Sequence, residues 1–535
     1  MTIQTDMPPV APRRPFVREL HGDTVSDDYA WMRDPDDPEL RQYMAAERRY
    51  YDAQTQHLDG LAETLAAEAA GRFPAGDEYS VAWPQGGYAY RTRLPAGRDN
   101  EQLLRRKAGE DFEQVMLDEN VLAERTGYVE VGVREPSEDG ALLAWSADRT
   151  GAEIYELRIR DLQTGEDLPE VIEPTYPGIA WSTASDYLFY LVPDELHRPF
   201  QVWRHRVGSP PSEDALVLEE PDQRFELRLG ASRSGELAIV TAGSRETTEV
   251  WVIALARPLD DAVLVEPRRE GIEYRIDHAR GGDVYVVTNA DSVEFALMRA
   301  PAGSPGRASW QPVRCPAIAP ARADTRLVRC DVFADRLVLT VRRHGVQLLV
   351  IADHDGGNVR EIEPSLQAGS IRIDHDEDYD RGSVIIVEES LIEPPAWFDL
   401  ELAGGTRRLL KRLEVPGYDP ARYMTEQLTA PARDGTPVPV TIARRADVEL
   451  DGAAPCLLYG YGAYEDSIDP EFDRSLPMLI VIDDTAGKPG VLDSTIRLLR
   501  IADVSKLSGE LVLRDIVEFL SRAGRKSGAF RVLSV

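Results

Sequence analysis

The sequence is poor in cysteine. Its three cysteines, Cys315, Cys330 and Cys456, are odd in number and lie far from any Cys-x-x-Cys spacing. This excludes a framework of disulfide bonds and offers no thiolate set for a zinc ion. We therefore expect a cytoplasmic protein, in a reducing compartment, that holds no metal and needs no cofactor.

Long hydrophobic runs and positive charge are scarce as well. No run approaches the ~18 apolar residues of a membrane span, and residues 1–15 are polar and rich in proline, unlike a signal peptide. The 61 Lys and Arg residues face 93 Asp and Glu residues, which gives a formal charge of −32. Such a surface repels nucleic acids and anionic membranes, so we expect neither as a partner, whereas it suits cationic ligands or simple solubility.

Histidine is missing from the last part of the chain. Eight histidines occur, none of them follows His375, and their spacing fits no metal site. A serine nucleophile needs a histidine as its general base, and α/β-hydrolases place that histidine after a Gly-x-Ser-x-Gly elbow and an acidic residue. The sequence contains no such elbow. We therefore expect the chain to lack a complete serine-type catalytic triad.

Two kinds of secondary structure are indicated up to about Leu402. Residues 36–69 place apolar and aromatic residues at helical spacing among Glu, Arg and Gln, which predicts amphipathic helices. From Glu78 onward, short β-rich runs alternate with turn clusters. The clearest runs are residues 88–92, 142–146, 187–191, 284–287 and 337–341. Roughly 325 residues, at about 45 residues a blade, predict a β-propeller of about seven blades, although no blade signature such as a repeated Trp-Asp pair is evident.

A turn cluster at residues 414–423 ends this series of strands. Strand-like segments follow at residues 425–429 and 438–442, and the apolar residues 455–459 run into Gly460-Tyr461-Gly462. An apolar strand that leads into glycine-rich backbone is where hydrolases place oxyanion-binding groups. We interpret this region as the opening strands of an α/β sheet.

Sequence motifs spread over residues 12–479 occur in a characteristic order. They include Asp28-Tyr29-Ala30-Trp31-Met32-Arg33-Asp34-Pro35, Asp148-Arg149-Thr150-Gly151, Thr248-Glu249-Val250-Trp251, Ala432-Arg433-Asp434-Gly435-Thr436 and Tyr459-Gly460-Tyr461-Gly462-Ala463-Tyr464. Together they resemble the prolyl oligopeptidase family of serine peptidases and, within it, the oligopeptidase B group. Each motif is weak alone, and their order over this length carries the resemblance.

The resemblance implies a mainly β protein in which a seven-bladed β-propeller caps an α/β-hydrolase domain. Members of the family cleave short peptides that enter a cavity between the two domains, and oligopeptidase B cleaves after Arg or Lys. By position, Tyr461 matches the tyrosine that helps to form the oxyanion hole, a donor worth about 10²–10³ in rate. Asp469 and Glu471 match an acidic pair associated with basic substrate residues. The alternative for Tyr461 is a tyrosine that only packs within the fold. The alternative for Asp469 and Glu471 is an ordinary solvated turn.

The resemblance stops near Leu479. The elbow, acidic residue and histidine turn of the family do not appear in residues 480–535, so we expect a truncated hydrolase domain. The expected parts are an N-terminal helical segment of the hydrolase domain (1–77), the propeller (78–411), the first strands of the α/β-hydrolase domain (412–479) and a non-family tail (480–535).

The sequence therefore predicts a truncated serine-type oligopeptidase. We expect it to bind short peptides, including basic ones, but not to cleave them by itself. One alternative is a non-catalytic peptide-binding propeller module. Another is a defective product without function, whose unpaired strand edges would favour aggregation.

Overall fold

The computed structural model describes residues 7–374, 378–431, 435, 437–448, 455–459, 467–474, 497–501 and 531–532. The contacts of the chain divide it into two units, Met1–Phe73 and Pro74–Val535. No helix in the described part of the chain is long and apolar enough to cross a lipid bilayer.

The first unit starts with a β-hairpin. Strand β1 (Phe16–Leu20) pairs with β2 (Asp23–Asp27), and the two-residue turn between them places His21 and Gly22 at φ values of 52° and 86°. Two positive φ values are what a hairpin turn of this length requires, because they match the twist of the strands. A short 3₁₀ helix, η1 (Ala30–Arg33), follows the hairpin.

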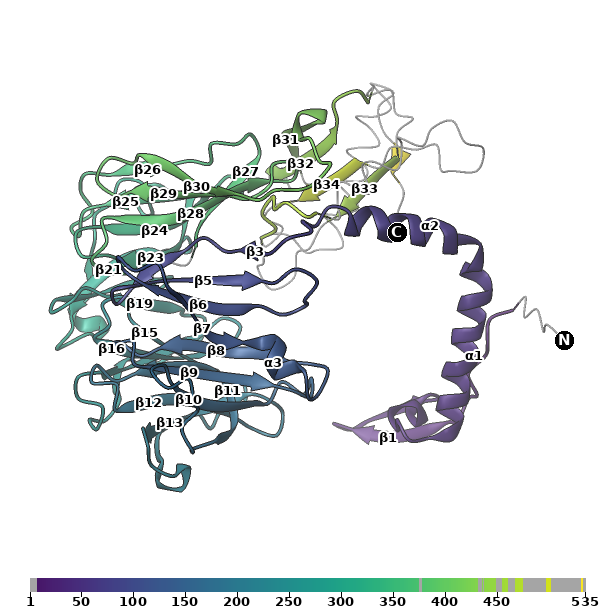
Figure 1. Ribbon diagram of the computed structural model, residues 1–535, viewed down its shortest axis with the longest axis horizontal. Helices are drawn as coiled ribbons and strands as arrows, with labels where there is room; N and C mark the ends of the chain where they lie inside the picture. The colour runs from purple at the N-terminus through teal and green to yellow at the C-terminus, as the bar shows by residue number, and fades with distance from the viewer. Residues whose placement is uncertain are drawn as a thin grey trace. The chain divides into compact units, whose positions relative to one another are not determined.

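Two helices complete this unit, as Figure 1 shows. Helix α1 (Pro38–Thr55) begins where the Asp37 carboxylate accepts the backbone N–H of Glu39, with proline in the first turn. After η2 (Gln56–Leu58), α2 (Asp59–Ala70) extends the helical segment. The helices predicted for residues 36–69 are therefore confirmed. No side chain of either helix is buried.

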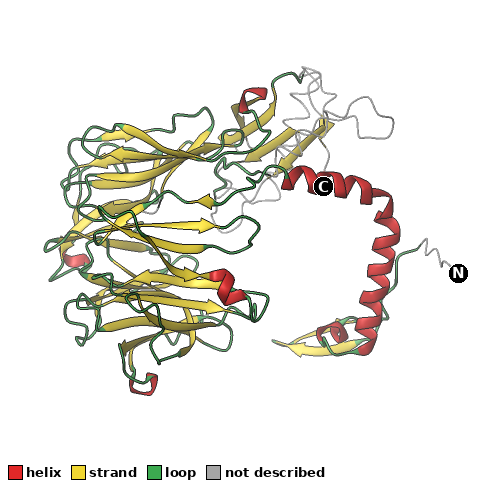
Figure 2. Ribbon diagram, in the orientation of Figure 1, coloured by secondary structure: helices red, strands yellow, loops and turns green. Residues whose placement is uncertain are grey.

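The second unit opens with six antiparallel sheets that follow one another along the chain (Figures 1 and 2). The first sheet holds β3 (Glu78–Tyr79), β4 (Trp83–Gln85), β5 (Tyr88–Leu94), β6 (Gln102–Lys107) and β7 (Glu113–Asp118). The second holds β8 (Glu130–Pro136), β9 (Leu142–Asp148), β10 (Tyr155–Asp161), β11 (Ile172–Trp181), β12 (Tyr187–Pro193), β13 (Pro199–Arg206) and β14 (Ala215–Glu219).

The other four sheets have four strands each. They are β15 (Glu226–Ala231), β16 (Leu237–Gly243), β17 (Thr248–Ala254) and β18 (Val263–Glu266); β19 (Tyr274–His278), β20 (Asp283–Thr288), β21 (Ala296–Pro301) and β22 (Gln311–Pro312); β23 (Thr325–Val332), β24 (Leu337–Arg343), β25 (Val346–Ala352) and β26 (Arg360–Ile362); and β27 (Gly369–Ile373), β28 (Ser383–Ser390), β29 (Ala396–Glu401) and β30 (Arg407–Arg412). Short helices in the connections are α3 (Glu119–Ala123), η3 (Pro211–Glu213) and η4 (Arg307–Ser309).

Each sheet packs against the next through apolar faces. One cluster joins Phe189 and Leu191 of β12 to Leu227 of β15 and Val240 of β16, and a later one joins β24 and β25 to β27 and β28. Burying each such side chain stabilises the fold by about 1.5–3 kcal/mol. Successive sheets packed face to face are the arrangement of a β-propeller, so the predicted propeller is confirmed.

A mixed sheet follows the propeller. Its order is β31-β32-β34-β33-β35, from β31 (Tyr423–Pro431), β32 (Pro437–Arg445), β33 (Pro455–Tyr459), β34 (Arg497–Ile501) and β35 (Arg531–Val532), and the 3₁₀ helix η5 (Pro420–Arg422) precedes it. β31, β32 and β34 pair antiparallel, whereas β33 runs parallel to both β34 and β35. The strands predicted around residues 425–429, 438–442 and 455–459 are present.

Candidate functional site

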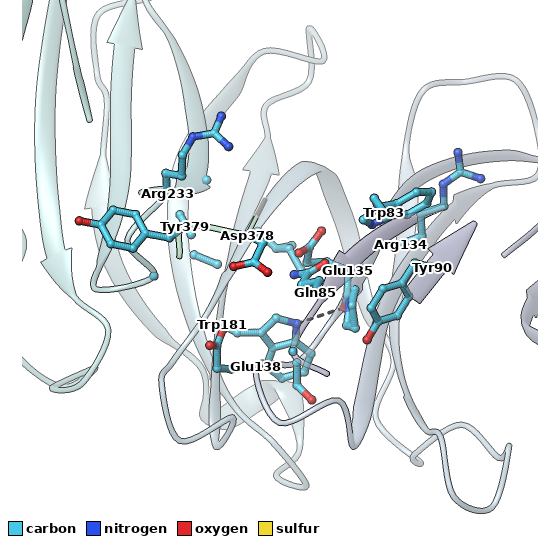
Figure 3. Close-up of a pocket in the computed structure, with 18 of the residues that line it drawn as sticks. Trp83, Gln85, Tyr90, Arg134, Glu135, Glu138, Trp181, Arg233, Asp378 and Tyr379 are labelled. Carbon is cyan, nitrogen blue, oxygen red and sulfur yellow. Dashed lines mark hydrogen bonds between the residues drawn. The ribbon is translucent and has the colours of Figure 1, made fainter. Parts of the chain in front are cut away.

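A cavity of about 930 Å³ lies in the second unit, at turns that join neighbouring strands of the sheets. The turns β8–β9, β11–β12, β15–β16, β19–β20 and β27–β28 contribute to its wall, as does the edge of β4 in the first sheet. Figure 3 shows Trp83, Glu135, Trp181, Arg233 and Asp378 drawn around this space. Residues from five of the six sheets thus line a common cavity, and the second sheet contributes two of the turns.

A serine recurs in three of these turns and holds each one closed. The N–H groups of Leu142, Tyr187 and Leu237 donate to the hydroxyls of Ser137, Ser182 and Ser232 at 3.0, 2.9 and 3.1 Å. In every case the serine N–H donates back to the carbonyl of the same partner. A serine five residues before the following strand is therefore a feature that these three turns share.

The cavity wall carries more negative than positive groups. Its carboxylates are Glu101, Glu135, Glu138, Asp374, Asp378 and Asp380, and its guanidinium groups are Arg134, Arg233 and Arg280. Each of these arginines is paired with a carboxylate: Arg134 with Glu101 at 3.1 Å, Arg233 with Asp331 at 2.8 Å and Arg280 with Asp380 at 2.8 Å. The remaining excess of carboxylates gives the cavity a field that attracts cations.

Indole rings lie among these carboxylates. Trp181 donates its Nε1–H to the Glu135 carbonyl at 3.2 Å, and Trp397 donates to Asp374 Oδ2 at 2.9 Å. Both rings are held by these bonds, and an indole face attracts a cation, as a carboxylate does. The wall can therefore contact a cationic side chain both electrostatically and through aromatic faces.

A buried polar cluster supports the turn that carries Arg233. The Asp277 carboxylate accepts the backbone N–H groups of Arg233, His278 and Val332 at 3.0, 2.9 and 2.8 Å. Burial raises the pKa of Asp277 to about 6, because it disfavours the charged form. The His278 ring lies 2.8 Å from the Ser234 hydroxyl, and burial lowers its pKa, so this imidazole is neutral near pH 7.

Two of the three residues predicted from the sequence lie in residues 467–474, and Tyr461 lies outside the described residues. Asp469 forms a two-pronged ion pair with Arg342 of β24, with Oδ1 at 2.7 Å from Nη1 and Oδ2 at 2.8 Å from Nη2. The two side chains are only 18% and 11% exposed. Glu471 is exposed. The structure therefore places Asp469 on the propeller and away from the central cavity.

The same segment contacts two further sheets of the propeller. The Ser370 hydroxyl donates to the Pro470 carbonyl at 3.3 Å, and the N–H of Phe472 donates to Glu389 Oε2 at 2.9 Å. At its end, Arg474 forms two hydrogen bonds to the Glu78 carboxylate, at 3.1 and 2.6 Å. We call residues 467–474 the clasp segment, because it touches the fifth, sixth and first sheets in turn.

A second hollow, of about 460 Å³, opens beside Asp469. Its wall includes Arg343 at the end of β24, His344 and Gly345 of the β24–β25 turn and Gln427 of β31. Polar and apolar groups share this wall, and Asp469, whose carboxylate accepts from Arg342, forms part of it. No group of three or more His, Cys, Asp or Glu side chains within the described residues could hold a metal ion.

Comparison with known proteins identifies the family to which this architecture belongs. Residues 8–412 match the model of the prolyl oligopeptidase N-terminal β-propeller domain. The chain belongs to the prolyl oligopeptidase family. It is 33% identical over 482 residues to protease 2 of Moraxella lacunata, with 88% of this chain and 68% of that protein covered. It is 34% identical over 489 residues to dipeptidyl aminopeptidase BI of Pseudoxanthomonas mexicana, with 87% and 66% covered.

The fold is also that of a solved relative. Oligopeptidase B from Leishmania major superposes with a TM-score of 0.86 at 23% identity, and the match covers 98% of this chain and 77% of that one. At this identity the likeness concerns the fold alone. The chain spans about two thirds of the length of the two curated relatives.

Proposed function

We propose that this chain recognises short basic peptides, in the manner of an oligopeptidase B-like serine peptidase that cleaves after Arg or Lys. The observation that carries the proposal is the Arg342–Asp469 pair, since a guanidinium already sits on this carboxylate in a two-pronged geometry. Charge-assisted pairs of this kind are the strong and directional ones. Asp469 and Glu471 are then the acidic pair that binds basic substrate residues, as the family resemblance implied.

One long strand supports a count of seven blades. In β11, the residues up to Thr175 pair with β10, whereas the residues from Tyr176 to Trp181 pair with β12. A strand that changes partner midway serves two blades, so the seven-stranded sheet counts as two. The propeller of residues 78–411 then has seven blades, and the mixed sheet from β31 onward is the start of an α/β-hydrolase domain to which residues 1–77 also belong.

By itself the 535-residue chain is proposed not to hydrolyse peptides. It has no Gly-x-Ser-x-Gly elbow and no histidine after His375, so a hydroxyl has no base to activate it. Tyr461, as an oxyanion donor, cannot replace a nucleophile, because the parts of a triad act together.

A labelling experiment tests the expected lack of peptidase activity. The purified chain is treated with a fluorophosphonate probe beside an active serine peptidase, and cleavage of Arg- and Lys-containing fluorogenic peptides is followed in parallel. We expect no labelled serine and no cleavage above background. Stoichiometric labelling of any serine would show that the chain holds an activated nucleophile and would reject the proposal.

Peptide binding is tested by calorimetric titration with an Arg-Arg peptide at physiological salt. Replacing Asp469→Asn together with Glu471→Gln removes two carboxylates, and we expect affinity to fall about tenfold, the value of one charge-assisted hydrogen bond. The matched control is Glu195→Gln with Asp261→Asn, which removes the same charge from two other exposed positions. Equal binding by all three proteins would show that Asp469 and Glu471 form no binding site. The general electrostatic field of the acidic chain would then account for the affinity.

The acidic cavity supports a second candidate function, a non-catalytic propeller module that binds peptides at its centre. Its carboxylates and indole rings fit cationic side chains without any contribution from Asp469. Replacing Glu135→Gln together with Glu138→Gln separates the two possibilities. Loss of affinity in this variant, with none in the Asp469 and Glu471 variant, would favour the cavity.

A further inference from the structure

The guanidinium of Arg342 occupies the Asp469 carboxylate, which is the position that the proposed function assigns to an arginine of a bound peptide. Both prongs of Arg342 engage Asp469, and the pair is largely shielded from solvent. Arg342 lies on β24 of the propeller, 127 residues away in sequence from Asp469. An arginine side chain of a peptide that binds Asp469 must therefore meet a site that is already filled.

We propose that Arg342 is an internal competitor for the guanidinium site of Asp469, and that an arginine side chain of a bound peptide displaces it. This inference rests on the proposed recognition of basic peptides and adds the residue that regulates it. In the peptide-free state Arg342 occupies the carboxylate. In the bound state the peptide arginine occupies it, and Arg342 returns to its own hairpin.

The hairpin offers partners that make this exchange feasible. Arg342 Nη1 also donates to the Gly345 carbonyl at 3.1 Å, and Nη2 lies 3.5 Å from Gln347 Oε1. His344 and Gly345 form a turn with φ values of 51° and 79°, which keeps that carbonyl beside the guanidinium. A displaced Arg342 therefore keeps hydrogen bonds, which limits the cost of leaving a buried charge without partners.

The hollow beside Asp469 provides the route for the incoming side chain. Its volume of about 460 Å³ exceeds that of one arginine side chain, and Asp469 forms part of its wall. The exchange also predicts selectivity. Arg342 can be matched only by another planar fork with two parallel donors, so a lysine ammonium displaces it less well than a guanidinium does.

Exchange would leave the other anchors of the clasp segment in place. Ser370, Glu389 and Glu78 still hold Pro470, Phe472 and Arg474 when Arg342 departs. Peptide binding should therefore free the β24–β25 hairpin while the clasp segment stays on the propeller. The proposal thus predicts a local change at one hairpin.

The test measures the affinity of a fluorescently labelled Arg-Arg peptide by anisotropy at physiological salt. If Arg342 fills the site about nine-tenths of the time, Arg342→Gln should tighten binding about tenfold, since apparent affinity is reduced by the fraction of competent sites. Arg342→Lys should give a smaller gain, because an ammonium is a weaker competitor. The control is Arg326→Gln, which removes the same charge from the residue paired with Arg342 across β23 and β24.

Four outcomes decide between the two proposals. Tighter binding by Arg342→Gln alone, abolished when Asp469→Asn is added, supports the competitor. Unchanged binding in Arg342→Gln with loss in Asp469→Asn overturns the competitor but leaves the proposed function intact. Weaker binding in Arg342→Gln makes Arg342 a positioning residue for Asp469 and overturns exchange. Full binding by Asp469→Asn rejects the peptide site itself.

Hydrogen exchange gives a second readout that does not depend on affinity. Addition of the unlabelled Arg-Arg peptide to the wild-type chain should raise amide exchange in the β24–β25 hairpin, and addition of a Lys-Lys peptide should raise it less. Protection of this hairpin on peptide binding would contradict displacement. Circular dichroism of each variant confirms folding before either measurement.

Discussion

The buried carboxylate of Asp277 makes the stability of the fold depend on pH. The Asp277 pKa of about 6 lies above the ordinary aspartate value of about 3.9, so its protonated form is favoured in the folded state. Its contribution to stability is complete below pH ~4 and is lost as pH rises through about 6. Three backbone donors depend on this side chain, so it cannot turn away to reach solvent.

Replacing Asp277→Asn should therefore flatten the pH dependence of stability between about pH 4 and 6. The variant should also be less stable by about 1–3 kcal/mol at low pH, because one amide oxygen replaces two acceptors. Denaturant unfolding of both proteins at pH 4, 5 and 6 measures the difference. Parallel curves for wild type and variant would mean that Asp277 does not titrate in this range.

At the scale of the element, a serine hydroxyl holds three of the turns between strands closed. Ser182 is fully buried and bonds both to Asp186 Oδ1 at 2.9 Å and to the N–H of Tyr187. Its hydroxyl satisfies backbone and side-chain groups that the tight turn leaves without ladder partners. The turn therefore fixes where the second strand of the blade begins.

Ser182→Ala should lower the free energy of unfolding by about 1–2 kcal/mol, because a buried N–H and a carboxylate lose their partner. Ser209→Ala is the matched control, since Ser209 bonds only one carbonyl, that of Arg206, at an exposed turn. Thermal and denaturant unfolding of the two variants measure the contrast. Similar losses would show that the serine in the blade turn has no special role.

The elements were more predictable from the sequence than their long-range contacts. Apolar runs at residues 142–146 and 337–341 fall within β9 and β24, because the second strand of each blade is buried on both faces and reads as a continuous apolar run. The helical spacing before residue 70 gave α1 and α2 for a similar local reason. Three of the turns carry a local signal too, in the serine five residues before the strand.

The candidate site was less predictable, because its partners are distant in sequence. Asp469 was found from motif position, yet nothing near Arg342 in the sequence indicates that it meets this carboxylate. The acidic cavity likewise arises only when turns from successive sheets are brought together. A contact of this kind depends on the curvature of the propeller, which local patterns do not encode.

At the scale of the whole second unit, the ring of sheets needs a connection between its ends. The first sheet contains only strands β3 to β7 and the last only β27 to β30, so among the described strands none is shared. Lys411 of β30 donates to the Tyr79 carbonyl of β3, and Arg474 of the clasp segment holds Glu78 on the same strand. The clasp segment thus reinforces the junction between the first and last sheets.

The Arg474–Glu78 pair joins the clasp segment to β3 at this junction. Arg474 lowers the pKa of Glu78 by hydrogen bonding to its charged form, so the pair contributes stability above pH ~4.3 that is lost as pH falls through the lowered folded value. At neutral pH, Arg474→Gln should raise amide exchange in β3 about fivefold, the effect of roughly 1 kcal/mol on local opening.

Arg343→Gln is the control for this variant, because Arg343 forms a two-pronged pair with Glu361 inside the fifth sheet, which does not pair with β3. The effect of Arg474→Gln on β3 should exceed that of Arg343→Gln and should begin to fade as pH falls below about 4.3. Equal exchange in β3 for both variants would mean that the sheets alone hold the ring closed. The clasp segment would then be held on the propeller through Asp469, Pro470 and Phe472, and its role would be recognition alone.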